Sequence, residues 1–398
     1  MRLDSALVQS VVTATLAALL ASCGTFSPEP PSVQSLRTDP ASRVLPKLPE
    51  RLGLGGGEIR LPGATINTRG TVRALIFPLS VGERLPAWTD STIAYHLVGT
   101  HRPPTERAAA GFLARASHGL FHLEATIFPH LANVDIAPEA LPVLLQKPEG
   151  VQMLVENAIT TWASRVNLAA YDNDGADGHP MSGDDDGVLD LTIVLLETDS
   201  TPAIVRVPTD LVLAVGKQNR LRVRAGTAYL FTIPRRLDVD ATHMGLVALI
   251  LGAAGLSADE MFFPDAFDRR ISTLARLRLG WIGGVLVTHS GEYDITPGIA
   301  FAVPLVDVDR NRGLWLLEHE EAAVYLTRVA RKANGHFATV DVHQVREGDP
   351  ELLLPLTATE GEHGARLRIR WDSGKAPKAH VALTASAVRE ERGASAQH

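Results

Sequence analysis

The densest group of side chains able to do chemistry is a set of aspartates gathered in one loop with glycines between them. Its members are Asp172, Asp174, Asp177, Asp184, Asp185, Asp186 and Asp190. Calcium takes six to eight oxygen ligands at adaptable distances, which an acidic and flexible loop can supply. The spacing is not that of an EF-hand, because an aspartate stands where the glycine of the sharp turn belongs. The loop therefore indicates either a solvated acidic segment or a calcium site, with the candidate ligands Asp172, Asp174, Asp177, Asp184, Asp186 and Asp190.

The only cysteine, Cys23, closes a short apolar stretch near the N-terminus. That stretch is too short to span a bilayer comfortably and is typical of a signal peptide. Leu20, Ala21, Ser22 and Cys23 together resemble the lipobox of bacterial lipoproteins, in which the cysteine thiol receives a diacylglyceryl group. We expect residues 1–22 to be removed and the lipid on Cys23 to hold the chain in the membrane. An uncleaved anchor, or an ordinary signal with a chance cysteine, are the alternatives.

The cysteine count, the net charge and the residue after Cys23 limit which partners and which cellular compartment we expect. A single cysteine forms no disulfide within the chain, and once acylated it provides no thiolate for zinc or catalysis. The net charge is −7 and no basic cluster is present, so nucleic acid is not expected as a partner. Gly24 is not the aspartate that retains many lipoproteins at the inner membrane. We therefore expect an exported protein of the bacterial cell envelope, at the outer membrane if the host has one.

The segment after Cys23 and the body differ in composition. Residues 23–58 are rich in proline, serine and glycine and predict a flexible tether. Hydrophobic periodicity predicts helices over 108–116, 151–166 and 244–254. It predicts strands over 71–79, 118–129, 189–196 and 229–234. Short strands and turns follow from about residue 291, for example 365–371 and 380–384. We expect an α+β domain over 59–290 and a small β-rich region over 291–398.

Four segments in order along the chain carry a family likeness. They are Ala116 to Leu123, Tyr171 to Asp190, Leu279 to Ile282 and Leu314 to Glu318. These resemble a turn into a strand, a "YDNDGDG" loop, an "LGW" and a "YFLLENR" strand of the immune inhibitor A-type metalloproteases, metallopeptidase family M-six. The resemblance implies a zincin-like metalloprotease domain followed by the small β-rich region. It also implies structural calcium, which relatives in this family bind.

The helix that should hold the catalytic zinc departs from the family pattern, HExGHxxGxxD. In that pattern two histidines one turn apart bind zinc and the glutamate activates a water. Matching Gly252 to the internal glycine puts Leu249 and Ala253 at the histidine positions. Ile250 then replaces the glutamate, and Asp259 falls at the third-ligand position. Hydrocarbon offers no lone pair to a metal, and one carboxylate cannot hold zinc alone, so no zinc is expected.

Other histidines do not supply a replacement site. His118 and His122 lie on a predicted strand, where residues four apart are separated by about 13 Å at ~3.3 Å per residue. His243 precedes the helix, and His319 is followed by Glu320 and Glu321 without a second histidine. These patterns favour ordinary surface histidines over a relocated zinc site.

The function expected from these features is that of a catalytically inactive, metalloprotease-like envelope lipoprotein. It would act by binding an envelope protein or peptide, or as a structural component. One alternative is an active metalloendopeptidase with an atypical zinc site. Another is a calcium-stabilised surface module, with adhesion supplied by the β-rich C-terminal region. The apolar helix over residues 244–254 favours the inactive lipoprotein over the active endopeptidase.

Overall fold

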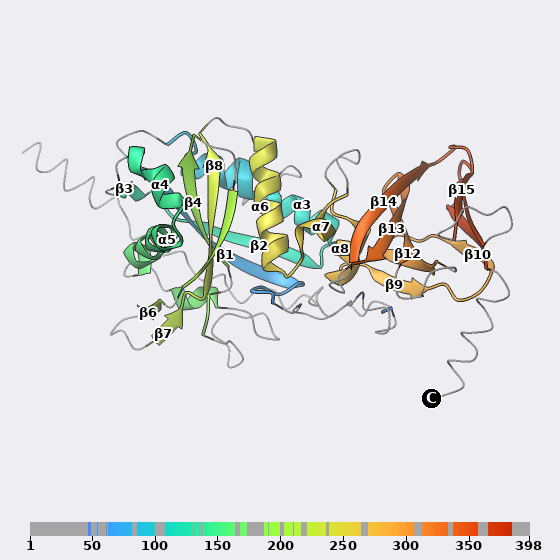
Figure 1. Ribbon diagram of the computed structural model, residues 1–398, viewed down its shortest axis with the longest axis horizontal. Helices are drawn as coiled ribbons and strands as arrows, with labels where there is room; N and C mark the ends of the chain where they lie inside the picture. The colour runs from blue at the N-terminus through green and yellow to red at the C-terminus, as the bar shows by residue number, and fades with distance from the viewer. Residues whose placement is uncertain are drawn as a thin grey trace, which may run out of the picture. The chain divides into compact units, whose positions relative to one another are not determined.

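A six-stranded sheet forms the centre of the first part of the structure (Figure 1). Its strand order is β2-β1-β4-β8-β5, and β3 pairs with the far end of β1. All pairs are parallel except β5 with β8, which is antiparallel. The strands are β1 (Gly70–Val81), β2 (Phe121–Ile127), β3 (Leu131–Val134), β4 (Leu191–Thr198), β5 (Ala203–Pro208) and β8 (Thr227–Pro234).

The structure is a computed structural model, and the residues it describes belong to one compact unit, Thr38–His398. They are residues 47–48, 54, 61, 63–81, 86–99, 108–129, 131–134, 136, 138–163, 168–172, 187–189, 191–199, 203–209, 211–215, 221–235, 239–263, 270–305, 313–332, 337–356 and 365–383. The expected signal peptide, Cys23 and most of the tether lie outside them.

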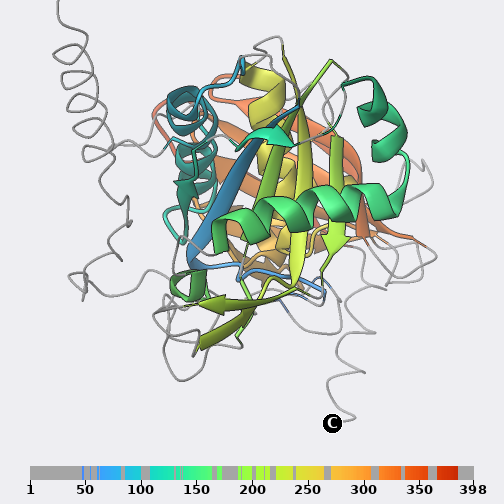
Figure 2. The ribbon, with the colours of Figure 1, turned by 90° about the vertical axis from the view of Figure 1, so that its left-hand side faces the viewer.

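Helices cover both faces of this sheet because its strands are apolar on both sides. Leu75 and Phe77 of β1 pack with helix α5 (Pro148–Ala163) on one face. Ala74 and Ile76 point to the other face, toward α3 (Ala109–Ala116) and α6 (Val239–Ala253). Figure 2 shows α5 in front of the sheet and α6 behind it. The remaining helical segments are α2 (Asp90–Thr92), η3 (Ile93–Val98), η4 (Pro138–Ala140), α4 (Leu141–Leu145), η5 (Leu168–Tyr171), α7 (Ala258–Met261) and α8 (Thr273–Arg278).

Two further sheets follow α8. A five-stranded sheet has the order β14-β13-β12-β11-β9, and a four-stranded sheet has the order β10-β17-β16-β15. Their facing apolar side chains, among them Trp315, Leu326 and Ile369, form one core. The strands are β9 (Gly283–Leu286), β10 (Gly291–Asp294), β11 (Ile299–Pro304), β12 (Gly313–Glu320), β13 (Ala323–Arg331), β14 (Phe337–Arg346), β15 (Leu352–Pro355), β16 (Arg366–Arg370) and β17 (Lys378–Ala382). A separate hairpin joins β6 (Val212–Val215) to β7 (Leu221–Arg224).

The expected fold class, an α+β zincin-like domain with a small β-rich appendage, is wrong. Among the described residues strand exceeds helix, 43% against 26%. Part of the excess is strand that the sequence did not predict. The outer strand β5 is exposed at nearly every position, and β6 and β7 form a separate two-stranded sheet. Because β5 does not follow the half-buried alternation by which strands are found in a sequence, the predicted share of strand was too small.

Candidate functional site

The three positions that the family resemblance matches to a zinc motif, Leu249, Ile250 and Ala253, lie inside the core on α6. Leu249, Ile250 and Ala253 are each 1% exposed, and they pack in the cluster that includes Phe231 of β8. Gly245 of α6 faces that ring closely enough to leave no room for a side chain. A Cβ atom on Gly245 would lie 2.8 Å from Cζ of Phe231. Along the part of α6 whose side chains are described, from Thr242 to Ala253, the helix presents no exposed polar residue at which a metal and water could meet.

Asp259, the position matched to the third zinc ligand, lies in α7 and faces away from the core. Its side chain is 61% exposed and forms an ion pair with Lys332. The structure therefore does not bring Asp259 into the apolar surroundings of Leu249 and Ala253. Within the described residues, no three histidine, cysteine or acidic side chains form a group able to hold a metal ion.

The acidic loop is described only at its borders. Asp172 follows η5 and is 5% exposed, although its type is usually found at the surface. Asp174, Asp177, Asp184, Asp185, Asp186 and Asp190 lie outside the described residues. The loop precedes β4, a strand that is buried along its whole length in the central sheet.

We predict that calcium stabilises the folded chain through this loop. A ligand that binds only the folded state raises the free energy of unfolding by RT ln(1 + [L]/Kd), which is about 2.7 kcal/mol at 100 times Kd. The melting temperature should rise with calcium concentration, and Asp174→Ala should abolish most of the rise. Magnesium at the same concentration and Asp349→Ala, which changes an exposed aspartate just after β14, serve as controls. An unchanged melting temperature across millimolar calcium would count against the site.

Four histidines considered in the sequence, His118, His122, His243 and His319, lie within the described residues and belong to no group of metal-binding side chains there. His118 lies in the turn before β2 rather than on the strand, whereas His122 is an exposed residue of β2. His243 of α6 is buried with its ring edge-on to Phe112, at 5.5 Å between centroids. His319 packs edge-on against Trp371 at 4.9 Å. The expectation that these are ordinary surface residues was therefore wrong for His243, which is 7% exposed.

A buried charged cluster centred on Arg276 is the feature that sequence reasoning missed. Arg276 belongs to α8 and is 1% exposed. Its Nη1 lies 3.0 Å from Oε1 of Glu318 and 2.8 Å from Oε2 of Glu320, both on β12. Its Nη2 lies 2.8 Å from Nε2 of His118. The cluster thus ties α8 to a strand of the second part and to the turn before β2.

The carboxyl group of Glu318 is fully buried in this cluster. Burial raises its pKa, the neighbouring Glu320 adds to this rise, and the resulting pKa is about 7. The positive charge of Arg276 lowers the pKa of Glu318, and so does a hydrogen bond with Thr273. Glu318 therefore changes its charge near neutral pH, where an ordinary glutamate is fully ionised.

His118 is held in an uncommon backbone conformation. Its φ is +52° and that of the following Gly119 is +77°. The amide of His118 donates to the carbonyl of Arg115, and that of Gly119 donates to the carbonyl of Ala114. This is a Schellman helix end in which histidine occupies the left-handed position usually held by glycine. Because a guanidinium only donates, Nε2 of His118 accepts from Arg276 and the ring proton lies on Nδ1.

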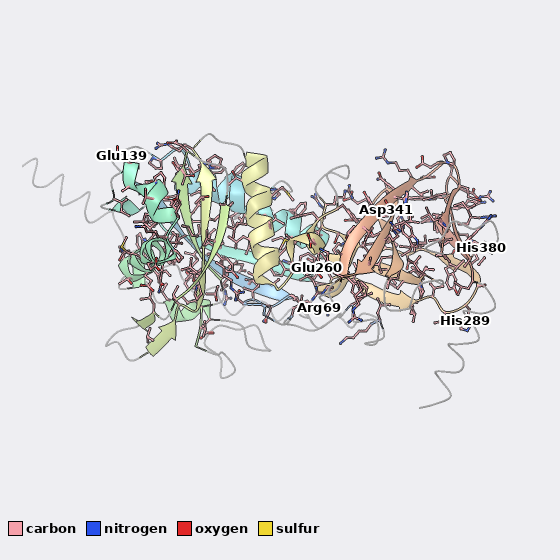
Figure 3. All side chains as sticks on the ribbon, viewed as in Figure 1. Arg69, Glu139, Glu260, His289, Asp341 and His380 are labelled. Atoms are coloured by element: carbon pink, nitrogen blue, oxygen red, sulfur yellow. The ribbon has the colours of Figure 1, made fainter. Side chains whose placement is uncertain are left out.

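A second ion pair, between Glu260 and Arg278, lies beside the cluster (Figure 3 labels Glu260). Glu260 is 1% exposed and also accepts the backbone amide of Ser257 at 3.0 Å, which forms a capping box at the start of α7. The hydroxyl of Ser272 donates to the carbonyl of Glu260. These contacts fix α7 against α8 and so fix the helix that carries Arg276.

Three of the segments that carry the family likeness meet at Arg276. His118 comes from the first, Glu318 from the last, and Leu279 follows α8 directly. The cluster could have been suspected from one signal, an arginine on the apolar face of a short helix between Leu274 and Leu277. A buried arginine needs a carboxylate partner, but the sequence does not say which glutamate supplies it.

The sequence matches no known protein family and no curated protein. None of the described helices combines the length and the apolar character needed to cross a bilayer. What the described site can do chemically is to present fixed positive and negative charge beside an apolar surface.

Proposed function

We propose that the chain is a non-catalytic lipoprotein of the bacterial cell envelope that acts by binding a partner or as a structural component. The observation that carries the proposal is the burial of Leu249, Ile250 and Ala253 in the core. A peptidase of the resembling family needs imidazole and carboxylate groups at these positions, with water reaching them. The hydrocarbon there supports the absence of catalysis.

Zinc content and peptide hydrolysis test this proposal directly. We expect the purified chain to contain far less than one zinc ion per molecule by mass spectrometry and to leave casein intact. Glu260→Gln should be as inactive as the unmodified chain, since no step depends on a carboxylate near α6. Stoichiometric zinc together with casein turnover that a chelator stops would contradict the proposal and favour an active endopeptidase.

The membrane attachment is part of the same proposal and depends on Cys23. The sequence Leu20 to Cys23 supports acylation of the thiol, and each buried methylene contributes about 0.8 kcal/mol to membrane binding. A radioactive fatty acid should label the wild-type chain in growing cells and should not label Cys23→Ser. The label should appear in the outer-membrane fraction of a host that has one. Label that persists in Cys23→Ser would exclude this anchor.

A further inference from the structure

Two leucines that precede the central sheet, Leu48 and Leu54, are buried against the second part of the structure, the two sheets that follow α8. Leu48 is 9% exposed and Leu54 is 1% exposed. Both belong to an apolar cluster that contains Leu277 of α8 and Leu316 of β12. Both also lie within residues 23–58, the segment that the sequence predicts to be a tether. Buried leucines give this segment a hydrophobic stabilisation that a freely solvated tether does not have.

Gly284 of β9 leaves the space that Leu48 occupies. A Cβ atom at position 284 would lie 2.5 Å from Cγ of Leu48 and 3.0 Å from Cδ1 of Leu277, whereas carbon atoms in contact prefer about 3.5–4.0 Å. The φ of Gly284 is not positive, so its backbone conformation does not require glycine. Glycine inside a strand weakens it and often marks a close approach of another segment. We call the contact of Leu48 with Leu277 and Gly284 the Leu48 seat.

A third leucine, Leu61, packs against the first part of the structure. It is 4% exposed and belongs to the core cluster that contains the buried side of α6. A Cβ atom on Gly255, just after α6, would lie 3.0 Å from Cβ of Leu61. A little further on, the amide of Thr65 donates to the carbonyl of Ala253 at 2.7 Å. Leucines of the N-terminal segment therefore contact both parts of the structure.

We propose that Leu48, Leu54 and Leu61 form a strap that fastens the N-terminal segment to both parts, and that the membrane tether ends at the Leu48 seat. The anchor then acts on the five-stranded sheet and not on the start of β1. The run from Cys23 to Lys47 spans at most about 85 Å, at ~3.3–3.6 Å per residue. This limit on the distance from the membrane rests on the proposed acylation of Cys23, whereas the strap does not.

A double-mutant cycle between Leu48 and Gly284 tests the seat. Leu48→Ala should lower the melting temperature of the purified chain by at least about 2 °C, because it leaves a cavity in the seat. Gly284→Ala should also lower it, because the new Cβ forces Leu48 out of its place. The double variant should melt no lower than Gly284→Ala alone, since the small side chain at position 48 makes room for that Cβ.

Lys47→Ala is the matched control, because Lys47 is the exposed neighbour of Leu48. It should melt as the wild-type chain does. Additive losses in the double variant would overturn the proposal, as would a melting temperature of Leu48→Ala equal to that of Lys47→Ala.

A disulfide between the two positions gives a second measurement, which does not depend on how well Gly284→Ala folds. The Cβ atoms of residues 48 and 284 would lie within about 4 Å, because a carbon–carbon bond of ~1.5 Å separates Cβ from the Cγ that is 2.5 Å away. A disulfide needs about 3.5–4.5 Å between these atoms. Leu48→Cys, Gly284→Cys should therefore form one on air oxidation.

The thiols are counted in denaturant without reductant, in a chain in which Cys23→Ser removes the only other thiol. This change also prevents acylation, so failure of the strap and failure of the anchor are distinguishable. Leu48→Cys with Gly291→Cys is the control, because a Cβ atom on Gly291 would meet only Tyr293 within 4 Å. The control should keep both thiols. Two free thiols in Leu48→Cys, Gly284→Cys, or equal oxidation of the two pairs, would overturn the proposal.

Discussion

Replacing Leu249 by His, Ile250 by Glu and Ala253 by His should unfold the protein rather than restore a protease. All three side chains are 1% exposed. The substitution removes about 1.5–3 kcal/mol of hydrophobic stabilisation for each of the two large side chains. It also buries two imidazoles and a carboxylate without partners, at about 1–3 kcal/mol or more for each. The sum reaches the roughly 5–15 kcal/mol that stabilises a typical domain.

The matched control places the same residues at the same spacing on the exposed face of α5. Gln152→His, Met153→Glu, Glu156→His changes two exposed positions and one half-buried position. It should alter the free energy of unfolding by no more than about 1 kcal/mol. Urea unfolding followed by circular dichroism, in the presence of a chelator, measures both variants. A triple variant on α6 that folds, binds zinc and cleaves casein would show that the helix borders an open cleft.

Arg276→Met should also destabilise the fold strongly. It leaves Glu318 buried without its partner and removes the contact of Glu320, and losing one member of a buried ion pair costs about 3–5 kcal/mol. Arg270→Met is the control, because Arg270 is 30% exposed and its loss should cost about 1 kcal/mol or less. Urea unfolding at pH 8 gives both values. Equal losses in the free energy of unfolding for the two substitutions would show that the buried ion pair contributes no more to stability than the exposed one.

The pH dependence of the same cluster has a definite sign. The pKa of Glu318 is raised from 4.5 to about 7 in the folded chain, so between these values the folded state holds a proton that the unfolded state has lost. The contribution of Glu318 to stability is therefore greatest below pH 4.5, falls as pH rises and is constant above about 7. The difference in unfolding free energy between the wild-type chain and Glu318→Gln should fall by about 3 kcal/mol across this window. A flat difference would mean that Glu318 keeps an ordinary pKa.

The sequence predicted individual elements better than their assembly. The apolar run after Thr71 is β1, the helix with Leu154, Val155 and Ile159 on one side is α5, and the apolar helix before Gly255 is α6. Each of these segments has either a clear hydrophobic period or an unbroken apolar run, so the local sequence pattern was enough to predict it. The outer strand β5 has neither, because solvent rather than the core faces most of it. The share of strand was underestimated in part for this reason.

Sequence reasoning was informative only for features that lie within one segment of the chain. The apolar character of Leu249 and Ala253 can be read from the helix alone, and the structure places both in the core; the absence of zinc stays a prediction. The cluster of His118, Arg276 and Glu318 joins residues far apart in the chain, and no spacing rule links them. Its members were recognisable as polar residues, but their pairing depends on how α8 packs against β12.

The order of strands in the central sheet determines when a growing chain can fold. β1 pairs with β2 and β4, and β4 pairs with β8. Synthesis begins at the N-terminus, and the parallel partners of β1 are separated from it by whole helices and loops. The central sheet is incomplete until Thr227–Pro234 has left the ribosome. Contacts between distant segments also form slowly, because long loops must close first. More than half of the polypeptide is therefore made before the central sheet can be completed.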